Sequence, residues 1–121
     1  MLDTTRGPAS RPVLLSGETE RVRTGHGNLY ITVNTDDAGA PFELFSTLGK
    51  AGGCNVAQLE ALSRLASLLL RSGVSPMAIV EQLEGITCCP LYDNGVLIKS
   101  PADAVGMALR KRMGNRGIAD P

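Results

Sequence analysis

Aromatic side chains are scarce in this chain of 121 residues. It contains no tryptophan, 2 tyrosines and 2 phenylalanines, too few for the stacking platforms that bind single-stranded nucleic acids. An excess of charge of one sign is also absent, because 12 Lys and Arg side chains balance 12 Asp and Glu side chains. A chain without a net basic field does not attract a polyanion over long range. We therefore expect no nucleic-acid partner.

Long hydrophobic runs are absent as well. No stretch approaches the ~20 apolar residues that a membrane helix needs, and the N-terminus carries Asp3 where a secretory signal would be apolar. The 3 cysteines lack the even number and the spacing of a disulfide framework. Free thiols are typical of a reducing compartment. These absences predict a cytoplasmic protein with no membrane partner.

The first half of the chain has the period of β-strands. Residues 29–34 alternate apolar with polar side chains, as a half-buried strand does. Residues 20–24 and 42–45 are predicted to form the strands before and after it. Asp36 and Asp37 precede Ala38-Gly39 and are interpreted as turn residues. Together these segments predict an antiparallel meander.

From residue 55 the apolar period becomes helical. A long helix is predicted over residues 55–72, with Asn55 as its N-cap. Its apolar stripe includes Leu59, Leu62, Ala66 and Leu69 and is widened by Val56, Leu65 and Leu70. Three of these side chains are expected to pack against Ile31, Val33 and the strand at 42–45: Leu62, Ala66 and Leu69.

Two further helices are predicted downstream. One follows Ser75 and ends near Gly85, and the other covers residues 100–112 behind a capping box of Ser100 and Asp103. A turn at 93–95 leads into a short strand between them. Strands followed by helices indicate an α+β fold, a small antiparallel meander packed on one face by a long helix and two shorter helices.

The domain is expected to span residues 13–113. The segment before it (1–12) is predicted to be a mobile leader, and the segment after it (114–121) a mobile tail. At this length, a single domain accounts for the whole chain.

Several short motifs resemble those of a known family. They are Thr24-Gly25, the run at 30–34, the stretch at 41–53, Glu60-Ala61, Arg64-Leu65, the run at 70–74, the run at 83–86 and Asp103-Ala104. In this order and spacing the chain resembles the TSCPD domain. This is the C-terminal domain of adenosylcobalamin-dependent (class II) ribonucleotide reductases, and it also occurs as a small stand-alone protein. The family signature Ser-Cys-Pro-Asp corresponds to residues 100–103, where Pro101 replaces the cysteine.

The resemblance implies a non-catalytic accessory or interaction domain related to the C-terminus of vitamin B12-dependent ribonucleotide reductase. It implies that this chain binds no cofactor itself and meets adenosylcobalamin only through a partner, the catalytic subunit of a class II reductase. One alternative is a part of a split class II ribonucleoside-diphosphate reductase. A second is a small anion- or metal-binding sensor. An edge strand and a Leu-rich helix also favour a homodimer.

A glycine-rich turn before the long helix is one candidate site. Gly49, Lys50, Gly52 and Gly53 combine bare backbone N–H groups, a cation and a helix N-terminus, which together attract anions or a partner carboxylate. The turn lacks the Ser or Thr that follows the lysine of a phosphate-binding P-loop. The same glycines also serve a purely structural reversal between strand and helix.

The second candidate site is a set of soft ligands. Cys54, Cys88, Cys89 and His26 together offer three sulfurs and one imidazole, the donors that zinc prefers. Their spacing is not that of a known zinc motif, so we expect free thiols and an exposed loop histidine here, with a metal site as the alternative. No catalytic residue is assigned.

Overall fold

The computed structural model describes residues 7–49 and 53–118, with side chains as far as Met113. Three strands form an antiparallel sheet in the order β1-β2-β3. They are β1 (Ser16–Thr24), β2 (Gly27–Thr35) and β3 (Pro41–Leu48). The predicted meander is confirmed, and its strands extend beyond the predicted bounds.

The side chains of the central strand, β2, alternate between buried and exposed positions, as predicted. Leu29, Ile31 and Val33 are at most 1% exposed, whereas Tyr30 on the opposite face is 38% exposed. The turn before β3 is held by Asp36, whose Oδ1 accepts hydrogen bonds from the backbone N–H groups of Ala38 and Ala40 at 2.9 Å. Its role as a turn residue is therefore confirmed.

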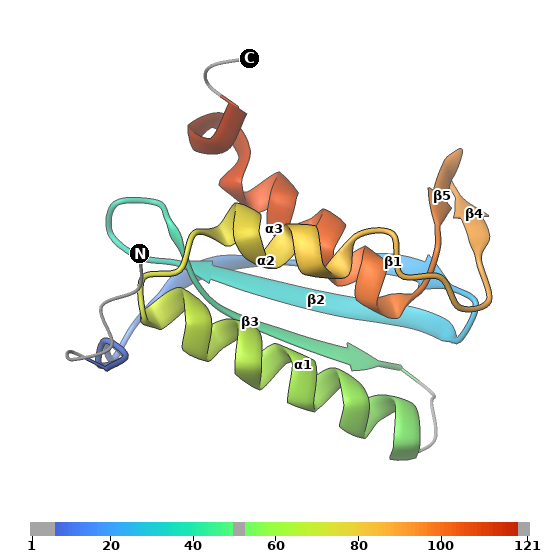
Figure 1. Cartoon of the computed structure of the whole chain (residues 1–121), viewed down its shortest axis with the longest axis horizontal. Coiled ribbons are helices and arrows are strands. Elements are labelled where there is room, and N and C mark those ends of the chain that lie inside the picture. The colour runs from blue at the N-terminus through green and yellow to red at the C-terminus, as the bar shows by residue number, and fades with distance from the viewer. Residues whose placement is uncertain (1–6, 50–52, 119–121) are drawn as a thin grey trace.

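Three helices and a small hairpin complete the α+β fold (Figure 1). The helices are α1 (Gly53–Arg71), α2 (Pro76–Leu83) and α3 (Pro101–Ile118). The hairpin pairs β4 (Leu91–Asp93) with β5 (Val96–Ile98) through Asn94 and Gly95, both with positive φ as a type I′ turn requires. α1 begins at Gly53, before the predicted Asn55. α3 continues past residue 112, and its 18 residues nearly equal the 19 of α1.

The prediction for the buried stripe of α1 is wrong in part. Ala66 is buried, but Leu62 is only partly buried and Leu69 is 38% exposed. Leu59 and Leu70, which also belong to the predicted apolar stripe, are buried, and so is Ser63.

The reason is the position of α1 beside the edge strand β3 (Figure 1). Ser67 Oγ accepts the Leu44 N–H and donates to the Leu44 carbonyl, each at 3.0 Å, and the Ser46 and Ser63 hydroxyls lie 2.6 Å apart. These serines set the rotation of the helix. They also bond groups on the outer edge of β3, which no further strand pairs within the described residues.

The middle of the sheet is covered by α3. This helix contacts all three strands of the meander and also α2. Its buried side chains Val105, Ala108 and Leu109 are at most 2% exposed and complete the core over β2. The loops at one end of this core carry the residues considered next.

Candidate functional site

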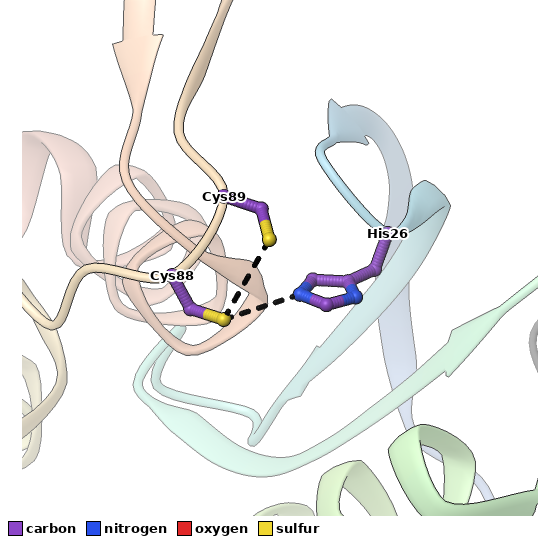
Figure 2. Close-up of side chains that lie close together, drawn as sticks. All are labelled: His26, Cys88 and Cys89. Atoms are coloured by element: carbon purple, nitrogen blue, oxygen red, sulfur yellow. Dashed lines mark hydrogen bonds between the residues drawn. The ribbon is translucent and has the colours of Figure 1, made fainter.

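Two loops bring a histidine and two cysteines together at one end of the sheet. His26 lies in the turn between β1 and β2, and Cys88 and Cys89 lie between α2 and β4. His26 Nε2 is 3.3 Å from Cys88 Sγ, and the two Sγ atoms are 3.9 Å apart. Figure 2 shows both sulfurs and the imidazole directed toward one another. All three donor atoms lie within 4.8 Å of one another.

The backbone holds the two loops close together. A Cβ added to Gly25 would lie 1.9 Å from the Cys89 carbonyl oxygen, so only glycine permits this approach. The Cys88 N–H donates to the Lys99 carbonyl at 2.7 Å, which fixes the cysteine loop against the segment before α3. On the other side, the His26 N–H donates to the buried Thr24 hydroxyl at 3.1 Å.

Cys89 has an unusual backbone for its residue type. Its φ of 55° is left-handed, a conformation that costs free energy for residues other than glycine. Both thiols are exposed. A hydrogen bond to Cys89 and the charge of that neighbouring thiolate raise the pKa of Cys88.

The structure brings together three of the four candidate soft ligands. Cys54 is exposed in the first turn of α1 and does not belong to the cluster of His26, Cys88 and Cys89. Its neighbour Asn55 comes closer, with Nδ2 3.4 Å from His26 Nδ1. The sequence did not predict this contact, because Asn55 was assigned to a helix cap.

A cavity of about 210 Å³ opens beside the cluster. Its lining combines polar and apolar side chains from the β1–β2 turn, α1, the cysteine loop and the start of α3, among them His26, Asn55, Gln58, Cys88, Ser100 and Pro101. Pro101, the position of the missing signature cysteine, therefore lies at the same cavity as the histidine and a thiol.

The signature aspartate has a structural position. Asp103 is 4% exposed, and its carboxylate accepts the Gly85 N–H at 2.8 Å and the Lys99 N–H at 2.9 Å. The Ser100 hydroxyl accepts the Asp103 N–H at 3.0 Å, so the predicted Ser100 cap is confirmed. Asp103 thereby ties the end of α2 to the start of α3, just behind the cysteine loop.

A second hollow, the α1–β3 groove, lies at the free edge of the sheet and has a volume of about 740 Å³. It is lined by Phe45, Thr47, Val56 and Leu68 and by the charged side chains Arg11, Glu43, Glu60, Arg64 and Arg71. Phe45 is 53% exposed and Leu68 is 46% exposed. Two exposed apolar side chains thus lie beside charged ones in this groove.

Arg11, which precedes β1, lines this groove. Arg11 makes two hydrogen bonds to the Glu43 carboxylate, at 2.9 and 3.0 Å, and Ala9 exchanges two bonds with Arg71. Burial tends to raise the pKa of Glu43, but the hydrogen bonds from Arg11 and Asn34 outweigh it and lower that pKa. Part of the predicted leader thus contacts the domain, while its mobility stays a prediction.

The glycine-rich turn is described only at its two ends. The Gly49 N–H donates to the Asn28 carbonyl at 3.0 Å and is not available to an anion. Gly53 is the first residue of α1. Lys50 and Gly52 lie outside the described residues, so the anion site stays a prediction.

Comparison with known proteins gives one match. A family model described as the TSCPD domain matches residues 4–113, nearly the whole chain. Searches of curated proteins and of solved structures found no match. None of the helices within the described ranges is long and apolar enough to cross a membrane.

Proposed function

Because the chain belongs to the TSCPD domain family, which is linked to B12-dependent ribonucleotide reductases, we propose that it is a non-catalytic accessory domain of such a reductase. Its partner is the catalytic chain of an adenosylcobalamin-dependent (class II) enzyme. The family match over residues 4–113 carries this proposal. Three exposed free thiols are consistent with a reducing, cytoplasmic location.

In this proposal, the partner chain binds the cobalamin. Cavities of roughly 300–1,000 Å³ accommodate drug-sized ligands, and the α1–β3 groove, at about 740 Å³, is of this size. Adenosylcobalamin, a corrin with two nucleoside arms, is larger than this groove can hold. The residues present therefore do not fit the cofactor, and no step of the reaction is assigned to them.

The α1–β3 groove is the surface that suits a protein partner. Phe45 and Leu68 supply an apolar centre, and Arg11, Arg64 and Arg71 stand at its margin. Protein interfaces combine such an apolar centre with a polar rim and are enriched in aromatic residues and arginine. Glu60 pairs with Arg64 across one turn of α1, and Arg71 lies over the Phe42 ring at 5.9 Å, so these charges are already positioned.

Reconstitution with a purified adenosylcobalamin-dependent catalytic chain from the same organism tests the proposal. The domain alone should form no deoxynucleotide, and adding it should change the rate of the catalytic chain until the effect saturates. If the catalytic chain is inactive until the domain is added, the split-reductase alternative is correct. If there is neither a complex nor a change in rate, the proposed function is wrong.

A further inference from the structure

The three donor atoms at the end of the sheet have the spacing of ligands around one metal ion. In a tetrahedral zinc site, bonds of about 2.3 Å to sulfur and about 2.0–2.1 Å to nitrogen place two sulfurs about 3.8 Å apart and a sulfur and a nitrogen about 3.6 Å apart. The corresponding distances here are 3.9 Å between the two Sγ atoms and 3.3 Å from His26 Nε2 to Cys88 Sγ, and the imidazole donor and Cys89 Sγ lie within 4.8 Å of each other. We propose that His26, Cys88 and Cys89 bind one Zn²⁺ ion through these atoms.

The chemistry of the donors selects this class of metal. Two thiolates and one imidazole favour zinc and other soft or borderline ions, whereas magnesium and calcium require oxygen ligands. The cluster lies at the surface, so an ion can enter without a rearrangement of the core.

The surrounding backbone arranges the ligands before an ion arrives. The left-handed φ of Cys89 turns its thiol to the side of Cys88, and Gly25 allows the histidine turn to approach this loop. Strain of this kind clusters at functional sites, where the surrounding structure maintains it.

Asn55 supplies the outer contact that a metal-bound histidine usually has. With the amide turned so that its oxygen faces His26 Nδ1, it accepts the Nδ1 proton and leaves the Nε2 lone pair for the metal. Asn55 is therefore a positioning residue and not a ligand.

A disulfide between the cysteines is the competing use of these thiols. Their peptide bond is trans, so their Cα atoms are about 3.8 Å apart. An ordinary disulfide needs a Cα separation of about 4.4–6.8 Å. The geometry therefore favours a shared metal over a bond between the two sulfurs.

Three protein ligands leave the fourth position of a tetrahedral ion open. The cavity of about 210 Å³, which is lined by His26 and Cys88 and also by Ser100, Pro101 and Ala102, leaves room beside the cluster for a fourth ligand. Water or a donor from a partner can fill the fourth position, as in zinc sites that exchange a ligand. A cysteine introduced at Pro101 would stand beside the site.

Zinc affinity of the full chain tests the proposal. Reduced protein is titrated with Zn²⁺ against a chromophoric chelator, and bound metal is measured after dialysis. We expect one zinc per chain and a loss of affinity of about tenfold or more in Cys88→Ser, Cys89→Ser and His26→Gln, since even outer contacts are worth about 10–100-fold. Cys54→Ser is the matched control and should bind zinc as the wild type does. Circular dichroism checks that each variant is folded.

Two further variants distinguish a specific zinc site from nonspecific binding of zinc by exposed thiols. Asn55→Ala should weaken zinc binding while leaving both thiols reactive, and Pro101→Cys should strengthen it. In the Co²⁺-loaded wild type, a thiolate-to-cobalt charge-transfer band should appear, and it should weaken in Cys88→Ser. The proposal is overturned if Cys54→Ser loses as much affinity as Cys88→Ser, or if the wild type binds no zinc. The proposal is also overturned if the wild type binds zinc no more strongly than Cys88→Ser does.

Discussion

Asp103 provides the sharpest test of how this fold is held together. Its carboxylate is 4% exposed and accepts backbone N–H groups from Gly85 and from Lys99 at 2.8 and 2.9 Å. Asp103→Asn keeps the shape of the side chain but replaces one acceptor oxygen by an NH₂ group. That group then faces an N–H donor, so one of the two hydrogen bonds is lost.

The expected loss in the free energy of unfolding follows from the type of hydrogen bond that Asp103 makes. A hydrogen bond to a charged group contributes about 1.5–3 kcal/mol, whereas one between neutral groups contributes about 0.5–1.5 kcal/mol. Losing one charged bond and weakening the other should lower the free energy of unfolding by about 2–4 kcal/mol. The lost negative charge in the first turn of α3 adds about 0.3–1 kcal/mol through the helix dipole. This is a large share of the 5–15 kcal/mol typical of a small domain.

Urea unfolding followed by circular dichroism at neutral pH measures this loss. Asp37→Asn is the matched control, because Asp37 is exposed, and it should stay within about 0.5 kcal/mol of the wild type. A loss below 0.5 kcal/mol in Asp103→Asn would refute the claim that the signature aspartate joins α2 to α3.

Three further predictions follow from the packing. Leu70→Ala should cost about 2–5 kcal/mol in the free energy of unfolding, and Leu69→Ala should cost less than about 1 kcal/mol. Equal losses in urea melts would show that the face of α1 is misassigned. Glu43→Gln should lower stability at pH 7, and this deficit should shrink as the pH falls through the folded pKa of Glu43. Folding lowers that pKa below its ordinary value of 4.5, so the contribution of Glu43 is fully present above the unfolded pKa and is lost as pH falls through the folded value; a deficit that stays constant as the solution is acidified would contradict this. Gly25→Ala should cost about 1–3 kcal/mol, because the new Cβ would meet the Cys89 backbone; a neutral effect in thermal melts would exclude that contact.

The strands and their turns could be predicted from sequence because their signals are local. Alternation along β2 needs no knowledge of the rest of the chain, and Asn94-Gly95 specifies its hairpin by backbone conformation alone. The helix face could not be predicted as reliably. Leucines occupy positions 68, 69 and 70, and hydrophobicity alone does not decide which of them faces inward. That choice depends on Ser67, whose partner in β3 lies 23 residues away.

The sequence indicates which residue types could form the candidate site, but it does not indicate which of them meet in space. His26 and Cys88 are 62 residues apart, and their contact depends on how two loops meet at the end of the sheet. Cys54 has the same chemistry but lies outside the cluster, a distinction that its side chain alone does not reveal. The Asn55 contact has no sequence signal at all, because asparagine at the start of a helix is ordinarily a cap.

Binding between this domain and a purified adenosylcobalamin-dependent catalytic chain tests the central claim most directly. Calorimetric titration should give a saturable complex that is weakened at least tenfold by Leu68→Asp, which places a charge in the α1–β3 groove. Val96→Asp is the matched control at the distant hairpin, since Val96 is 47% exposed and Leu68 is 46% exposed, and it should bind as the wild type does. No binding by the wild type, or equal loss in both variants, would contradict the account.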